Sequence, residues 1–171
     1  VAAPGVEIRG NIIQQPGDDA ARNGILVTNE ESTGAPVESP VDGVRVVNNE
    51  VGNFQSGVGI VSREANASTT IRNVTIAENT LGGDVAGNQL GIGIVERTGS
   101  SDLGDEIDLT DNTFDGNGIG VYIFGDEDSS ELTDASAGGV SITGNTFANP
   151  DGRVLENTST EMPTAPFHIV N

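Results

Sequence analysis

One short pattern recurs five times along the 171 residues, and it limits the possible folds more than any other feature. Each copy reads aliphatic-x-aliphatic-x-x-Asn-x-apolar, as in the segment from Val140 to Phe147. The copies contain, in order, the asparagines Asn11, Asn49, Asn79, Asn112 and Asn145. These asparagines are 38, 30, 33 and 33 residues apart. A period of this length is typical of solenoid proteins, in which each repeat forms one turn of a stack.

The apolar segments of every repeat have the features of β-strands. Apolar and polar residues alternate, and the segments are short, rich in Val and Ile, and bounded by Gly, Asn and Asp. A second apolar segment, opened by glycine, follows each copy; these segments are 24–27, 57–61, 91–95, 118–123 and a degenerate one at 152–155. We therefore expect an all-β fold, a single parallel solenoid domain over residues 1–171. It would have about five coils, starting near residues 6, 44, 74, 107 and 140.

The repeated asparagine has a physical explanation in such a stack. Equivalent residues of successive coils lie about 4.8 Å apart, so the five asparagines would form one column at the bend after the first strand. An Asn side chain there can satisfy its own turn and also the backbone amide of the neighbouring coil. We therefore predict a structural ladder of Asn11, Asn49, Asn79, Asn112 and Asn145.

The repeat units resemble those of a known superfamily. Segments such as 74–81 and 140–147 are similar to the repeats of right-handed parallel β-helix (pectin-lyase-like) proteins, including NosD-like repeats. The resemblance extends from Val6 to Val170 and implies a right-handed parallel β-helix. It implies little about function, because the shared residues are scaffold residues. A β-sandwich would not need the aligned asparagines, and the nonapeptide repeat of the calcium β-roll is absent.

The ends of the stack show no obvious cover in the sequence. Val6 starts a strand almost at once, and residues 167–171 look like the beginning of a further strand. Open strand edges pair with other chains, so solenoid ends need caps. We expect either part of a longer rod or coil ends covered by other copies or neighbouring domains. The alternative is that residues 157–166 fold back as a cap.

The composition excludes several classes of function. The absence of cysteine excludes disulfides, thiolate zinc sites and a cysteine nucleophile. The single histidine, His168, argues against a histidine metal cluster and is expected to be a strand residue. A net charge of -19 opposes binding to nucleic acid. No apolar run approaches the roughly 20 residues that span a bilayer.

The kind of charge is also informative. The chain has 26 acidic residues against 7 basic ones, all of which are arginine. Acid excess without lysine is typical of proteins adapted to high salt, because carboxylates hold water and cations and their repulsion is screened there. The regular apolar repeat argues against intrinsic disorder as the alternative. We therefore expect an extracellular or cell-surface protein of a halophilic or marine organism.

Outward positions also form columns in the expected stack. One column is Glu7, Arg45, Thr75, Asp108 and Ser141; another is Ile12, Glu50, Thr80, Thr113 and Thr146. Carboxylates of neighbouring coils can reach the separation of about 5–9.5 Å that paired carboxylates need for glycoside hydrolysis. Glu78 and Asp111, at matching positions, are the best such pair and are weak catalytic candidates.

The enzyme motifs of the resembled superfamily are missing. There is no Gly-His-Gly, no Arg-x-Lys and no Asp-Pro-His, and the absence of lysine argues against a pectate-like polyanion. We therefore expect a structural or binding module of a surface protein, fibre or filament, with no required cofactor and with glycans as potential partners. The alternative is a polysaccharide-active protein, such as a glycoside hydrolase, a lyase or a tailspike-like protein.

A calcium site is one further candidate. Asp111, Asp115 and Asn117 place oxygen donors at alternate positions, with glycine sixth, as at the start of an EF-hand loop. The twelfth position is Tyr122 rather than Glu, and the flanking segments read as strands. A tight acidic turn without an ion is the alternative.

Asn66, Asn73 and Asn157 begin Asn-x-Ser/Thr sequons and are candidate glycosylation sites. Asn66 and Asn157 are expected in loops between strands. Two outward columns contain threonines and would suggest ice binding. Glu50 interrupts the column that begins at Ile12, and Val47 and Ala77 interrupt a further column that consists of Arg9, Val47, Ala77, Thr110 and Thr143.

Overall fold

The computed structural model describes residues 3–16, 22–29, 40–62, 71–82, 87–96, 103–124, 140–148, 153–157 and 168–170. These residues form strands, turns and bends, and the strands build three parallel sheets. Within the described part of the chain there is no helix that could cross a membrane.

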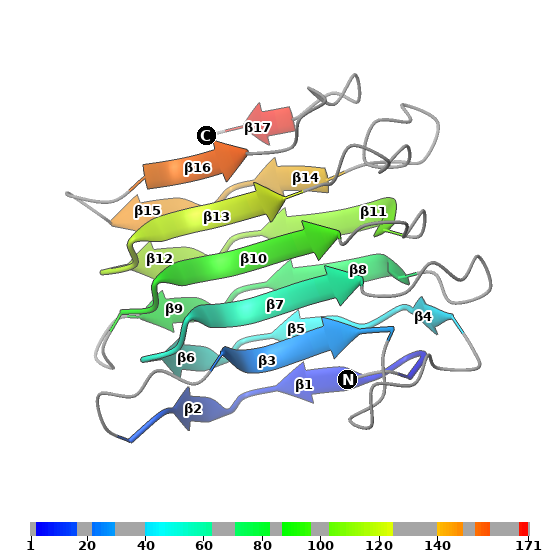
Figure 1. Ribbon diagram of the computed structural model, residues 1–171, viewed down its shortest axis with the longest axis horizontal. Coiled ribbons are helices and arrows are strands. Elements are labelled where there is room, and N and C mark those ends of the chain that lie inside the picture. Colours follow the sequence, from blue (N-terminus) through cyan, green and yellow to red (C-terminus); the bar gives the residue numbers. More distant parts are fainter. Residues whose placement is uncertain are drawn as a thin grey trace.

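Each sheet collects one strand type from successive repeats (Figure 1). Sheet A contains β1 (Glu7–Arg9), β4 (Val41–Asp42), β5 (Arg45–Val47), β8 (Ile71–Ala77), β11 (Leu103–Thr110), β14 (Val140–Thr143) and β17 (His168–Val170). Sheet B contains β2 (Ile12–Gln14), β6 (Glu50–Gly52), β9 (Thr80–Gly82), β12 (Thr113–Asp115) and β15 (Thr146–Ala148). Sheet C contains β3 (Asn23–Thr28), β7 (Ser56–Ser62), β10 (Leu90–Glu96), β13 (Ile119–Phe124) and β16 (Arg153–Asn157).

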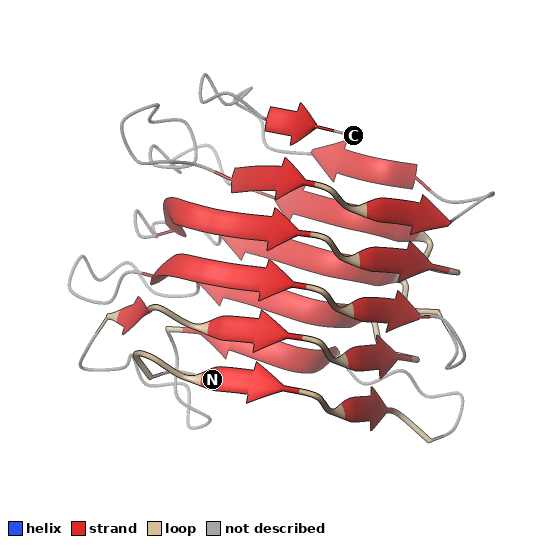
Figure 2. Cartoon of the chain, turned by 180° about the vertical axis from the view of Figure 1, so that it is seen from behind, coloured by secondary structure: helices blue, strands red, loops and turns tan. Residues whose placement is uncertain are grey.

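The chain winds through the three sheets as a right-handed helix. In Figure 1 the strands of sheet C run from left to right in front, and those of sheets A and B return behind them. The stack climbs from the N-terminus to the C-terminus during this winding. Figure 2 shows the same stack from behind, with the strands of sheets A and B meeting at a bend in each turn. The fold is therefore an all-β, right-handed parallel β-helix, as the sequence predicts.

The core consists of aliphatic columns that run along the stack. In sheet A the strand register places Val46, Ile76, Leu109 and Ile142 above one another, and none of them is more than 3% exposed. Burying each such side chain contributes about 1.5–3 kcal/mol. Sheet B adds a stacked aromatic pair, Phe114 and Phe147, with ring centroids 4.7 Å apart. Because each residue packs on its own equivalent, a short alternating segment suffices to extend the core by one turn.

Close packing leaves no room for a side chain at Gly91, the second residue of β10. A Cβ atom on Gly91 would contact the ring of Phe114 and the carbonyl oxygen of Gly120. The strands of sheet C therefore pass directly beside the aromatic core residues of sheet B, and a side chain at Gly91 would displace one of them.

The outward columns predicted from the alternation are confirmed by the strand register. Glu7, Arg45, Thr75, Asp108 and Ser141 are successive partners in sheet A. In sheet B the successive partners are Ile12, Glu50, Thr80, Thr113 and Thr146. The outer surface of the described strands is thus a mixture of charged, hydroxyl and aliphatic side chains that changes from turn to turn.

In the second, third and fourth repeats, sheet A begins earlier than the pattern indicates. β8 starts at Ile71 and β11 at Leu103, upstream of the predicted starts near 74 and 107, and Val41 in β4 pairs with Ile71. Val41 and Ile71 are fully buried, so they add one more layer to the core. The residue directly before the predicted start of each of these repeats has a left-handed conformation, with φ of 71° at Gly43, 51° at Asn73 and 55° at Glu106. These residues interrupt the alternation, which explains why the period of two stops there.

The C-terminal segments extend the same stack. Arg153–Asn157 pairs with β13, and His168–Val170 pairs with β14, so His168 is a strand residue as expected. The expectation that Asn157 lies in a loop is wrong, because it is the last residue of β16 and pairs with Ile123. Residues 158–167, most of the predicted cap, lie outside the described residues.

Candidate functional site

The bend between sheets A and B forms a groove over the first three turns of the stack. At each bend one residue adopts a left-handed conformation, with φ between 54° and 67°; these residues are Gly10, Asn48, Glu78, Asp111 and Gly144. Gly, Asn and Asp tolerate this conformation well, whereas Glu does so less readily. The first three of these residues form one wall of the groove, and the first three residues of the outward column of sheet B form the other. The ladder asparagines Asn11 and Asn49 lie between the two walls.

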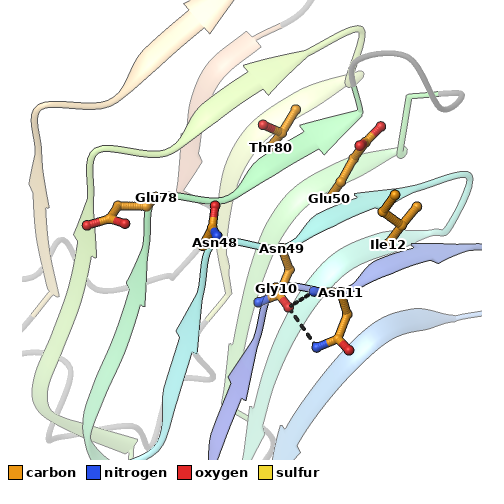
Figure 3. Close-up of a pocket in the computed structure, with 8 residues that line it drawn as sticks. All are labelled: Gly10, Asn11, Ile12, Asn48, Asn49, Glu50, Glu78 and Thr80. Carbon is orange, nitrogen blue, oxygen red and sulfur yellow. Dashed lines mark hydrogen bonds between the residues drawn. The ribbon is translucent and has the colours of Figure 1, made fainter.

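The groove deepens into a pocket of about 250 Å³ at the first three turns (Figure 3). Eight residues line it: Gly10, Asn11, Ile12, Asn48, Asn49, Glu50, Glu78 and Thr80. The absence of a side chain at Gly10 opens the wall, while Ile12 is 75% exposed at the same end. The pocket thus offers carboxylate, amide and hydroxyl groups beside one exposed aliphatic side chain.

The structure places the predicted catalytic pair, Glu78 and Asp111, at equivalent bend positions of neighbouring turns. Glu78 and Asp111 are both exposed at the left-handed position of the bend. Glu78 points away from Glu50 and Thr80 in Figure 3. Asp111 leans over Gly144, on the opposite side of the column from Glu78. Of the two residues, only Glu78 lines the pocket.

The five repeated asparagines form one column beneath this groove. Asn79 is 1% exposed, and both its backbone N–H and its Nδ2 donate to Oδ1 of Asn112, at 3.0 Å each. The same two bonds join Asn11 to Asn49, Asn49 to Asn79, and Asn112 to Asn145. Nδ2 of Asn79 also donates to the carbonyl oxygen of Val46 in the preceding turn, at 2.8 Å. The three inner asparagines, Asn49, Asn79 and Asn112, thereby connect the turns on both of their sides.

A second ladder, not anticipated from the repeat, lies where the chain enters sheet C. The N–H and Nδ2 of Asn88 donate to Oδ1 of Asn117 at 2.9 and 3.0 Å, and Oδ1 of Asn88 accepts the N–H of Phe54. Both asparagines are at most 3% exposed. The sequence signal is the motif Asn-x-x-Gly, present at Asn88–Gly91 and again at Asn117–Gly120. It is weak, because only two repeats have it at this place and the same spacing also occurs in the first ladder, at Asn49–Gly52 and Asn79–Gly82.

The predicted calcium residues occupy different environments. Asn117 is buried in the second ladder, where its Oδ1 accepts two hydrogen bonds from Asn88 and its Nδ2 donates to the carbonyl oxygen of Leu81. Asp111 and Asp115 are both exposed; Asp111 lies before β12, and Asp115 is its last residue. The side chain of Asp111 is directed at Gly144. No three acidic or histidine side chains of the described residues are grouped closely enough to hold a metal ion.

The glycosylation candidates also differ in environment. Asn73 is exposed, but its Nδ2, the atom that a glycan would modify, donates to Oδ1 of Asp42 at 2.6 Å. Asn157 ends β16, and Asn66 lies outside the described residues.

Among the described residues, Asp42 is the carboxylate with a clearly shifted pKa. The hydrogen bond from Asn73 and that from Arg72, whose Nε lies 2.9 Å from Oδ2, hold the pKa of Asp42 below its ordinary value of 3.8. The charge of Arg72 acts in the same direction, and desolvation opposes it. The ionised form therefore stabilises the link between β4 and β8.

The Asp42→Asn variant is expected to unfold at lower denaturant concentration than the parent chain at neutral pH. Because the folded-state pKa is lowered, the stabilisation is present above about 3.8 and is lost as the pH falls through the folded value. Denaturant unfolding at neutral pH and in strong acid checks this, with Asp108→Asn, an exposed carboxylate of sheet A, as the control. A difference between parent and Asp42→Asn that persists unchanged in acid would contradict the expectation.

Comparison with known proteins does not narrow the function. No protein-family model, no curated protein and no solved structure matches this chain.

Proposed function

We propose that this chain is a structural or binding module of an extracellular surface protein, fibre or filament, from an organism living in high salt. We further propose that it belongs to the parallel β-helix repeat (pectin-lyase-like) superfamily, which its repeat units resemble. In this function the β-helix holds a rigid, elongated surface, and its coil ends contact neighbouring domains or other copies.

The observation that carries the proposal is the contrast between a regular interior and an irregular surface. The ladder of Asn11, Asn49, Asn79, Asn112 and Asn145 and the aliphatic columns repeat at every turn. The outward columns do not: the positions equivalent to Glu50 are Ile12, Thr80, Thr113 and Thr146. A scaffold of this kind provides rigidity at each turn while its outer face is free to vary.

The surface charge supports the proposed environment. No acidic side chain is buried among the described residues, and those of Glu7, Glu78 and Asp108 are exposed. A net charge of -19 on a chain of 171 residues favours solubility and hydration in concentrated salt.

The pocket at the bend favours binding of a polyhydroxylated ligand over its cleavage. Asn48, Glu50 and Thr80 supply hydrogen-bonding groups, and Ile12 supplies a contact for an apolar face of a sugar ring. Hydrolysis would need two carboxylates directed at one glycosidic bond. Of the candidate pair, only Glu78 lines the pocket, and the carboxylate of Asp111 lies over Gly144 of the following turn.

Incubation with neutral and acidic polysaccharides in multimolar NaCl tests binding against catalysis. We expect calorimetry to detect binding of a polysaccharide, and we expect product analysis of the same mixture to find neither new reducing ends nor unsaturated products. The variant Glu78→Gln with Asp111→Asn is expected to leave this outcome unchanged. Product formation by the parent chain that this double variant abolishes would establish the polysaccharide-active alternative. Immunogold labelling of thin sections of the source cells tests the location, and labelling confined to the cell interior would overturn it.

A further inference from the structure

The first strand of sheet A has an open edge. β1 pairs with β5 on one side, and the described residues provide no strand on its other side. Figure 2 shows it at the bottom of the stack, beside the N-terminus. Its outward side chains, Glu7 and Arg9, are 44% and 60% exposed. Its inward side chain, Ile8, is only partly buried against the end of the core.

The backbone N–H and C=O groups of two residues of β1 face this open edge. The N–H of Arg45 donates to the carbonyl oxygen of Val6 at 2.9 Å, and Nδ2 of Asn49 donates to that of Ile8 at 3.0 Å. Since backbone groups alternate in direction along a strand, the N–H and C=O groups of Glu7 and Arg9 point away from β5. The carbonyl oxygen of Arg9 accepts one bond, from Nδ2 of Asn11, and retains a second lone pair.

We infer that β1 pairs antiparallel with β1 of a second copy, about a two-fold axis that passes beside Ile8. In this register Glu7 of each copy lies opposite Arg9 of the other copy. These two positions then form the hydrogen-bonded pairs of the ladder, because their backbone groups face the edge. Ile8 meets Ile8 of the second copy in the pair between them, which covers the open end of the core.

The side chains favour this arrangement. An antiparallel pair centred on Ile8 places opposite charges face to face twice, whereas a parallel in-register pair would face Glu7 with Glu7. Within one copy Glu7 already lies 3.4 Å from Arg45 and 3.6 Å from Arg9, so the second copy's Arg9 completes a line of alternating charges. The two-fold axis makes the contact self-complementary and closes it at two copies.

The distribution of charge along the stack favours contact at this end. Five of the seven arginines lie in the first 72 residues, whereas 17 of the 26 acidic residues follow residue 72. Pairing through β1 brings the less acidic ends together and keeps the more acidic ends apart. The inference deepens the proposed function, on which it rests, because it names a second copy of this chain as the partner at one coil end.

Sedimentation equilibrium of the chain over a range of concentrations tests the pairing at moderate ionic strength, where opposite charges are not fully screened. We expect a monomer–dimer equilibrium that does not proceed to larger assemblies. Arg9→Glu alone and Glu7→Arg alone should each weaken dimerisation by about tenfold or more, since each puts like charges opposite each other twice. The combined Glu7→Arg, Arg9→Glu variant restores opposite charges and should restore the dimer. Arg22→Glu, an exposed change of equal charge outside β1, is the control.

A crosslink provides a second measurement, because the chain has no cysteine of its own. Ile8→Cys is expected to form a disulfide-linked dimer under mild oxidation. Ile13→Cys, at a comparable partly buried position of β2, is not expected to do so. A chain that stays monomeric at all concentrations, growth beyond the dimer, or a combined variant that fails to recover would each overturn the inference. Surface labelling of cells and the polysaccharide assay can still succeed in that case, so the two proposals fail separately.

Discussion

Replacement of Asn112 with alanine is expected to lower the free energy of unfolding by about 3–5 kcal/mol, because it leaves several buried polar groups without partners. Oδ1 of Asn112 accepts the N–H and Nδ2 of Asn79, both at 3.0 Å. Its Nδ2 donates to the carbonyl oxygen of Ile76 at 2.8 Å and to Oδ1 of Asn145 at 3.0 Å. Asn112 is fully buried, so water cannot replace these bonds. Denaturant unfolding, followed by circular dichroism, measures the loss.

Asn11→Ala is the matched control for this variant. Asn11 occupies the same ladder position at the open end of the stack, where its side chain is exposed. Its removal should lower the free energy of unfolding by only about 0.5–1 kcal/mol, because water can satisfy the groups it leaves. Equal losses at positions 11 and 112 would contradict the role of the buried ladder in joining the turns.

Raising NaCl from dilute to multimolar concentration is expected to increase the free energy of unfolding by roughly 2–4 kcal/mol, because salt screens the repulsion among the acidic side chains. The chain carries a charge of -19, and Arg9, Arg45 and Arg72 form the ion pairs identified among the described residues. Repulsion therefore outweighs attraction at low salt. Denaturation in urea, which is uncharged, measures the change at each NaCl concentration.

Sucrose serves as the control for general solvent effects in the same titration. It strengthens burial without screening charge, so it separates the two contributions. Stability that is equal in dilute buffer and in multimolar NaCl would count against adaptation to high salt. Such a result would also remove the main argument for the proposed environment.

The repeat predicts how the chain winds, because an asparagine at the same place in every repeat marks the bend between two strands. The period of two identifies the strands of sheet A, and the glycine-opened segments identify those of sheet C. Asn79 and its equivalents mark the bend between sheets A and B. Residues in the left-handed conformation interrupt the alternation of apolar and polar residues, as Asn73 does. The pattern therefore did not predict the additional core layer formed by Val41 and Ile71. The second ladder, formed by Asn88 and Asn117, was not predicted because two copies do not establish a period.

The candidate site was less predictable than the fold. Matching positions place Glu78 and Asp111 on neighbouring turns, but the direction of each side chain depends on what the next turn offers. Gly144 has no side chain, so the carboxylate of Asp111 leans over it. The pocket beside Glu78 depends on the glycine at position 10 and on the exposed Ile12. A single repeat pattern, which averages over the turns, does not contain these local differences.

Hydrogen exchange of the asparagine side-chain amides, resolved by NMR, tests most directly whether buried ladders hold the turns together. The Nδ2 protons of Asn79 and Asn112 donate to buried acceptors on neighbouring turns. They are expected to exchange at least about 100-fold more slowly than those of exposed Asn11, because exchange requires the turns to separate. Exchange of Asn79, Asn112 and Asn11 at one common rate, equal to that of a free amide, would contradict the ladder.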